Sequence, residues 1–141
     1  MKFNINQNDL QQSLGYCQGV IEKRSTLPIL SNILLDATGS KLKIIATDLD
    51  LIFINEIKNV EILEEGKTTT VSSTLYDIIR KFNSGKKINF NQTSENKIQL
   101  ESEKSIFNLN CLSATEFPVT EESFTANEFS IKAKELLKLL N

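Results

Sequence analysis

The sequence predicts an α+β fold in which two helices pack on one face of antiparallel sheets. Two stretches carry apolar residues at helical spacing, and several shorter ones alternate apolar and polar residues as half-buried strands do. The order of strand, helix and several strands occurs twice, which is typical of helices sharing one side of a sheet. With 141 residues, the chain is long enough for one good core and too short for two ordinary domains.

The first half opens with a strand and a helix. Lys2–Asn6 alternates apolar and polar residues, and Asn6 or Asn8 is suited to cap the helix that follows. Apolar residues then recur at steps of four, three and four along one stripe of that helix: Leu10, Leu14, Cys17 and Ile21. Pro28 ends the helical region because it pushes Leu27 toward extended geometry.

Four predicted strands follow. Strong β-formers dominate these runs: Ile29–Leu35, Leu42–Thr47, Leu51–Ile57 and Lys67–Val71. Gly39 and Ser40 supply a turn between the first two. The acidic stretch Glu61–Gly66, just before the fourth run, is expected to be a solvated loop.

A second helix and three more strands complete the pattern. The helix ends at Asn83-Ser84-Gly85, and its apolar stripe is Leu75, Ile78, Ile79 and Phe82. Three alternating strands come next: Lys87–Asn91, Lys97–Glu101 and Ser105–Leu112. The polar stretch Ser113–Asn127, which contains Pro118, is expected to be a linker.

Composition narrows the possible partners and location. The chain is 40% apolar and 24% charged, which is typical of a soluble globular protein. Its formal net charge of −2 gives no overall attraction to nucleic acid, so any such partner must be met by a local basic patch. The chain starts without an apolar signal core, and no apolar run approaches the roughly 20 residues of a membrane-spanning helix. We therefore expect a cytoplasmic protein with no membrane partner.

The side-chain chemistry argues against an enzyme. The absence of histidine removes the commonest general base and the commonest zinc ligand. Cys17 and Cys111 lie far apart within apolar patterns, so we expect two buried, reduced thiols. Asp48 and Asp50 have the spacing of a metal-binding or acid–base pair, but no third carboxylate is close, and a turn role is expected. The prediction is a protein with no catalytic residue, cofactor or metal.

The end of the chain repeats its beginning. FSIKAKELLKLL laid over FNINQNDLQQSL matches at one constant offset: Phe3 with Phe129, Ile5 with Ile131, Asp9 with Glu135, Leu10 with Leu136 and Leu14 with Leu140. This match predicts a tandem domain repeat. Residues 1–121 would form a complete first domain, and residues 122–141 a linker with the first strand and helix of a second, truncated domain. The chain is then expected to be a fragment.

One segment resembles a known family. RSTLPILSNILLDATGSKLKIIATDLDL, residues 24–51, is similar to the amino-terminal region of the bacterial DNA polymerase III β subunit, the sliding clamp. That family shows Arg-x-Thr-Leu-Pro-Ile-Leu-x-Asn, then a hairpin and a Thr-Asp-Leu motif, here Thr47-Asp48-Leu49. Leu75–Lys81 looks like its second helix, and Phe107-x-Leu109 with Glu116-Phe117-Pro118 like its third-strand and linker region. The resemblance covers the whole chain, with Ser72-Ser73 replacing the Pro-Ala common at the start of the second helix.

The resemblance implies a DNA-clamp fold and a role in DNA replication. Family members have three similar domains per chain and close head to tail as a homodimer, which gives a six-domain ring with helices inside. The ring encircles double-stranded DNA as the processivity factor of the replicative polymerase, and polymerase activity belongs to the holoenzyme. The DNA polymerase III α subunit and the clamp loader would bind through domains absent from this chain.

The resemblance also selects DNA-binding residues. Arg24 matches an arginine that touches DNA in the family, and Lys23 is its weaker neighbour. Arg80 and Lys81 are expected to lie on the second helix, where they are either DNA contacts or a solvated face with favourable charge near a helix C-terminus. Lys86 and Lys87, in the next turn, are expected to be solvated.

The resemblance further suggests a dimer interface. By periodicity alone, Phe107 and Leu109 belong to the core; in the family, this strand pairs with the third domain of the other subunit, and apolar residues fill the seam. Lys104 would add a charge contact there.

The alternative function is a non-catalytic α+β interaction domain that binds protein and never encircles DNA. A clamp's full reading frame should continue through two further copies of the repeat, whereas a stand-alone module should stop.

Overall fold

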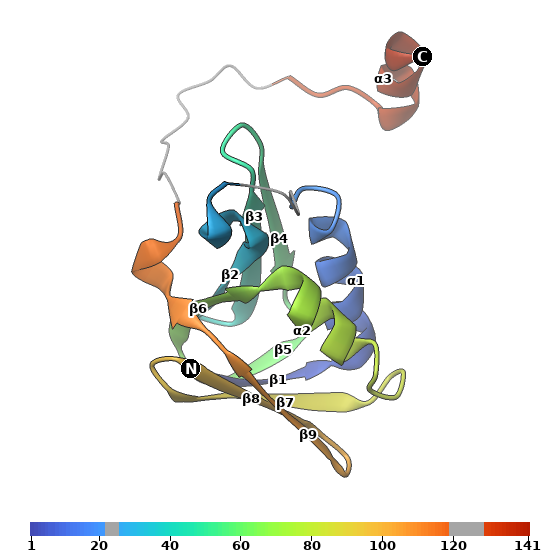
Figure 1. Ribbon diagram of the computed structural model, residues 1–141. Helices are drawn as coiled ribbons and strands as arrows, with labels where there is room; N and C mark the ends of the chain where they lie inside the picture. The colour runs from blue at the N-terminus through green and yellow to red at the C-terminus, as the bar shows by residue number, and fades with distance from the viewer. Residues whose placement is uncertain (22–25, 119–128) are drawn as a thin grey trace.

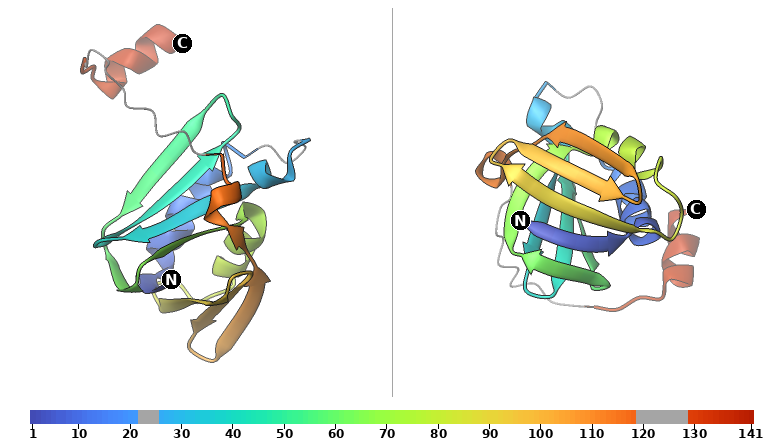
Figure 2. Two further views of the ribbon diagram at one scale, coloured as in Figure 1. Left: turned by 90° about the vertical axis from the view of Figure 1, so that its left-hand side faces the viewer. Right: turned by 90° about the horizontal axis from the view of Figure 1, so that it is seen from below.

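Two antiparallel five-stranded sheets form the body of the protein (Figure 1). The computed structural model describes residues 1–21, 26–118 and 129–141. Sheet A has the order β5 (Val60–Glu64), β1 (Lys2–Asn6), β7 (Lys87–Ser94), β8 (Lys97–Ser102) and β9 (Ser105–Asn110). Sheet B has the order β10 (Leu112–Ser113), β6 (Gly66–Val71), β2 (Asn32–Thr38), β3 (Lys41–Thr47) and β4 (Ile52–Ile57). Figure 2 shows sheet A from below, with β9 and β5 at its two edges and sheet B behind it.

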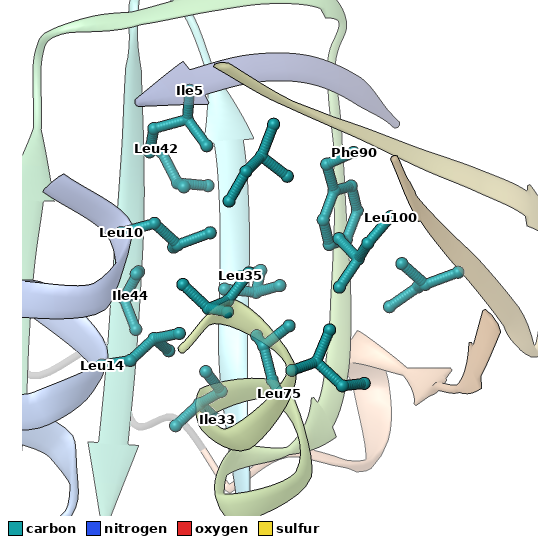
Figure 3. Close-up of a cluster of buried hydrophobic side chains, with 14 of the residues drawn as sticks. Ile5, Leu10, Leu14, Ile33, Leu35, Leu42, Ile44, Leu75, Phe90 and Leu100 are labelled. Atoms are coloured by element: carbon teal, nitrogen blue, oxygen red, sulfur yellow. The ribbon is translucent and has the colours of Figure 1, made fainter. Parts of the chain in front are cut away.

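Two helices pack against the inner faces of these sheets, as the sequence predicts. They are α1 (Gln7–Cys17) and α2 (Ser72–Ile79). Figure 3 shows Leu10 and Leu14 of α1 and Leu75 of α2 pointing toward Ile33 and Ile44 of sheet B. Sheet A closes the other side of this core with residues that include Phe3, Phe90 and Leu100, and the Phe3 and Phe90 rings stack 4.4 Å apart. Because this single core takes residues from both sheets and both helices, it fixes the helices relative to the strands.

Three local predictions were wrong. The acidic stretch predicted as a loop contains β5, whose Ile62 packs against the core while Glu61 points outward beside β1. The strand predicted from Ile29 begins only at Asn32, because Pro28–Ser31 forms the short 3₁₀ helix η1. The predicted linker begins with structure: β10 pairs with β6, and a second 3₁₀ helix, η2 (Ala114–Glu116), leads to the buried Phe117.

The tail contains the predicted helix without the predicted strand. Helix α3 spans Ala133–Leu140, and none of its residues is buried. Residues 129–131 have the alternation of a strand but pair with no strand of the described chain, and a lone strand has no ladder partner to hold it. The tandem repeat stays a prediction. Within the described residues, no helix is long and apolar enough to cross a membrane.

Candidate functional site

Helices α1 and α2 lie side by side in antiparallel directions. Gln7 Nε2, at the start of α1, donates to the Ile79 carbonyl at the end of α2 over 2.9 Å. Gln18 Nε2, just past α1, donates to Ser72 Oγ at the start of α2, also over 2.9 Å. The helices are therefore joined at both ends, and their exposed sides form one surface. We call this surface the helical face: Asn8, Gln12, Tyr16, Ser73, Thr74, Asp77, Arg80 and Lys81.

The turn after α2 is attached to the start of α1. Asn6 caps α1 by accepting a hydrogen bond from the Asn8 backbone N–H at 2.9 Å, which confirms one of the two predicted caps. The Asn8 side-chain oxygen accepts from Ser84 Oγ at 2.8 Å and from the Gly85 N–H at 3.2 Å. Gly85 has φ +75°, a conformation that disfavours any residue with a Cβ. These contacts hold the C-terminal end of α2, and the cations that follow it, beside the start of α1.

The helical face is polar and close to neutral. Asp9 is the sole charged residue of α1, and Asp77 is the sole charged residue of α2. Arg80 and Lys81, directly after α2, bring two positive charges to the same surface. Neither cation forms an ion pair within the described residues. The surface therefore offers a local pair of cations on a polar background whose one carboxylate is Asp77.

Aromatic rings position both cations. The Arg80 guanidinium carbon lies 5.4 Å from the centre of the Tyr76 ring, and Lys81 Nζ lies 5.9 Å from the centre of the Phe107 ring. Contacts of this kind contribute about 0.5–1 kcal/mol at exposed sites and leave the outer side of the charge open. Both side chains are exposed, so an anion can reach them.

Lys86 and Lys87, in contrast, have carboxylate partners. Lys86 Nζ lies 3.5 Å from Glu103, and Lys87 Nζ lies 3.2 Å from Glu61. Hydrogen bonds from Asn4 and then from Lys87 lower the pKa of Glu61 below its usual value. Lys86 lies in the predicted turn, whereas Lys87 is the first residue of β7, so the turn expected to hold both lysines ends at Lys86. Their carboxylate partners separate both lysines from Arg80 and Lys81.

Lys23 and Arg24 lie outside the described residues. Their assignment as DNA contacts stays a prediction. Among the four residues selected for DNA binding, the structure thus places Arg80 and Lys81 together on the helical face.

Strand β9, predicted to lie in the subunit seam, is an edge of sheet A. It pairs with β8 only, so its other backbone edge is open within the described chain. Leu109 is 7% exposed and belongs to the core, as periodicity predicts. Phe107 is half-buried, with its ring edge-on to Phe82 at 5.4 Å. Lys104 is exposed in the β8–β9 turn, and the role of all three in a dimer interface stays a prediction.

A second apolar edge, on sheet B, was not predicted from the sequence. Strand β4 is the outer strand of sheet B, and Ile52 and Ile54 on it are exposed. Leu49 and Leu51, in the preceding turn, are exposed as well. The available signal was the run Ile52-Phe53-Ile54, because a strand with apolar residues on both faces is usually covered on both.

The residues considered for other chemistry have structural roles. One Asp48 carboxylate oxygen accepts from the Asp50 N–H at 3.0 Å and the Leu51 N–H at 2.7 Å, so it forms the predicted turn. Cys17 and Cys111 are both buried and free, as predicted, and burial raises the pKa of Cys17 to about 12. Among the described residues, no group of three or more His, Cys, Asp or Glu side chains is arranged to hold a metal ion.

Comparison with known sequences gives one consistent result. The family profile described as "DNA polymerase III beta subunit, N-terminal domain" matches residues 1–121. The beta sliding clamp of Caulobacter vibrioides is 36% identical over 142 residues, a match that covers 100% of this chain and 38% of that protein. The beta sliding clamp of Pseudomonas aeruginosa is 32% identical, with 100% and 38% covered. This chain therefore spans well under half the length of these curated relatives.

Solved structures agree with the sequences. The Caulobacter crescentus pol III beta structure superposes with a TM-score of 0.92 and 36% identity, covering 99% of this chain and 37% of that one. The DNA polymerase III subunit beta of Pseudomonas aeruginosa also gives a TM-score of 0.92, with 31% identity and coverage of 99% and 38%. The likeness extends over both sheets and the helices between them.

Proposed function

The chain belongs to the DNA polymerase III β subunit family, and from this premise we propose that the whole protein is a DNA sliding clamp. The observation that carries the proposal is the match of family profile and fold across this chain. In this proposal, two copies of the longer protein form a head-to-tail ring around double-stranded DNA and act as the processivity factor of the replicative polymerase.

The helical face suits a protein that must slide. Phosphate contacts are independent of sequence, and each one adds affinity that resists movement. A dense basic row would fix the ring in place, whereas Arg80 and Lys81 on a neutral polar surface allow weak, replaceable contacts. We assign these two residues to transient phosphate binding. Arg24 and Lys23 complete the proposed DNA-binding set because they match the family's motif.

The ring needs joints between subunits, and β9 is suited to one of them. Its backbone edge is open, and Phe107 lies half-buried beside it. We propose that this edge pairs with the third domain of the other subunit, with Phe107, Leu109 and Lys104 at the seam. An open strand edge needs cover in a soluble protein, and a neighbouring subunit supplies it.

The remaining parts of the proposal concern the whole protein. Residues 1–121 would be the first of three similar domains, and residues 122–141 the linker and start of the second. The clamp itself would be non-catalytic and cytoplasmic. The polymerase III α subunit and the clamp loader would bind the later domains.

The test is topological retention of the full-length protein. It would be loaded by its clamp loader on a nicked circular DNA, and salt would then be raised to screen phosphate contacts. A clamp stays on the circle and leaves when the circle is cut, because linkage and not affinity retains it. Equal loss from circular and linear DNA would support the alternative, an interaction domain that does not encircle DNA.

A further inference from the structure

The two cations of the helical face lie over rings in different places. The Arg80 guanidinium lies over Tyr76, which is half-buried on α2. The Tyr76 hydroxyl oxygen is 3.8 Å from the position that a Cβ at Gly15 of α1 would take, so this ring lies against α1. Lys81 Nζ lies over Phe107, which belongs to β9, the open edge of sheet A (Figure 2). One ring is thus inside the helical pair, and the other is at a strand edge.

The Phe107 ring is held from the inside of the domain. Phe107 is the cross-strand neighbour of the buried Leu100, and its side chain packs against the main core. The buried Phe82 meets it edge-on, with ring centres 5.4 Å apart and an interplanar angle of 83°, a geometry that aromatic pairs favour. The ring therefore has partners on its inner side, while Phe107 as a whole is only half-buried.

A short turn after α2 brings Lys81 to this ring. The Lys81 N–H donates to the Ile78 carbonyl over 3.0 Å, and the Phe82 N–H donates to the Ile79 carbonyl over 3.3 Å. These bonds fix the backbone of Lys81 and Phe82, so two consecutive residues contact the same ring. None of the ion pairs among the described residues includes Lys81. The ring therefore holds an ammonium group whose charge is not neutralised by a carboxylate.

The strength of this contact depends on the exposure of the ring. A cation over an aromatic ring is held more strongly when the pair is removed from water than at an exposed site. A neighbour that covers the open edge of β9 would shield the Phe107 ring, because that ring is half-buried beside the edge. The same neighbour would not shield Tyr76, which lies against α1. Covering the edge would therefore strengthen the hold on Lys81 and leave Arg80 unaffected.

We propose that Phe107 links phosphate binding by Lys81 to closure of the subunit seam. This inference rests on the proposed function, in which β9 meets the other subunit and the helical face meets DNA. A closed seam holds the Lys81 ammonium group at the helical face, where it binds phosphate, and an open seam loosens it. Linkage requires the reverse as well, so a phosphate bound at Lys81 favours the closed ring. Arg80 binds phosphate in the same way in both states of the seam.

The size of the link follows from the change in exposure of one ring. The difference between an exposed and a desolvated cation–ring contact corresponds to about fivefold in an equilibrium constant. A head-to-tail homodimer has two seams, so the dimer dissociation constant should depend on the two Lys81 side chains by about 25-fold.

A double-mutant cycle on the full-length protein tests the link. Lys81→Gln should raise the dimer dissociation constant by about 25-fold in fluorescence-detected sedimentation, because it removes the contact that closure strengthens. Phe107→Leu keeps an apolar side chain in the seam and removes the ring, so Lys81→Gln should have no further effect in that background. Phe107→Tyr keeps the ring and should retain the full effect.

Arg80→Gln is the matched control. It removes the same charge one residue away, from a ring that the seam does not shield. The dimer dissociation constant of Arg80→Gln should stay within about twofold of the wild-type value. Unfolding midpoints of all variants verify that the fold is retained.

Subunit exchange in the presence of a short duplex tests the phosphate side. A duplex that contacts both subunits slows exchange in any case, and each single variant lacks one phosphate contact per protomer. Comparison of the two variants therefore isolates the link. Duplex should slow the exchange of Arg80→Gln more than that of Lys81→Gln, by at least about fivefold.

Four results would overturn the inference and leave the proposed ring in place. They are an unchanged dimer in Lys81→Gln, equal weakening by Lys81→Gln and Arg80→Gln, an undiminished effect of Lys81→Gln in Phe107→Leu, and equal slowing of exchange by duplex. A full-length protein that is monomeric, or a dimer that Phe107→Lys leaves intact, would remove the proposed seam and this inference with it.

Discussion

Arg80→Gln with Lys81→Gln, made in the full-length protein, tests whether the helical face meets DNA. Both side chains lie over aromatic rings without carboxylate partners in the described chain, so the change removes two available charges and no ion pair. Each phosphate contact contributes about 0.9 to the slope of log K against log salt, so the slope should become shallower by about 1.8 per protomer. At 0.1 M salt, each lost contact lowers affinity by about eightfold. Fluorescence anisotropy on labelled duplex DNA, from about 50 to about 300 mM salt, measures the slope.

Lys86→Gln with Lys87→Gln is the matched control. It removes the same charge from the next turn, but these lysines are paired with Glu103 and Glu61. The control should leave the slope nearly unchanged, because the field of the two removed lysine charges is screened beyond about 10 Å at 0.1 M salt. Equal slopes for the two double variants would show that net charge, and not the helical face, governs binding. Unfolding midpoints of both variants verify that neither change disrupts the domain.

Three further predictions concern the seam, a turn and a thiol. Phe107→Lys in the full-length protein should convert the dimer to a monomer, as measured by sedimentation. A dimer that persists would mean that Phe107 packs in the core and has no role in the dimer interface. Leu49 has φ +81°, so Leu49→Gly should raise the unfolding free energy by about 1 kcal/mol in a denaturant titration, and a decrease would mean that the turn is unstrained. Burial raises the pKa of Cys17 from 9.0 to about 12, so its contribution to stability is complete below pH 9 and is lost as pH rises toward 12. Between these pH values, the free energy of unfolding should fall more steeply than that of Cys17→Ala, by up to about 1.4 kcal/mol per pH unit. Parallel pH profiles of the two proteins would contradict this expectation.

Hydrophobic periodicity was sufficient to predict the helices that pack against the core. The stripe containing Leu10 and Leu14 and the stripe containing Leu75 and Ile79 both predicted helices whose apolar sides are buried. Periodicity did not predict β5, because the acidic composition of this stretch favoured a loop. Val60 and Ile62 nevertheless alternate with glutamates and pack against the core. The 3₁₀ helix at Pro28–Ser31 was missed for a different reason, since apolar residues in a short run fit either a strand or a turn of helix.

The candidate sites were predictable to a lesser degree, because a sequence pattern does not say which charges are already paired. From the sequence, Arg80 and Lys81 stayed open between DNA contact and a solvated face, and Lys86 and Lys87 were expected to be solvated. The structure divides them by partner: Glu103, in the β8–β9 turn, pairs with Lys86, and Glu61, on β5, pairs with Lys87. Such pairing depends on residues distant in sequence, and no local spacing reveals it.

Sliding requires the ring to hold DNA by linkage while its inner surface binds weakly. In the proposed clamp, the helical face would meet the second condition by two means. Lys86 and Lys87, which follow the helical face along the chain, are paired with carboxylates. The two cations on the face itself lie over aromatic rings and form no ion pair among the described residues. A phosphate can exchange between such cations without displacing an ion pair, so each step along the duplex has a low electrostatic cost. The same surface with Lys86 and Lys87 freed would bind DNA more tightly and move along it more slowly.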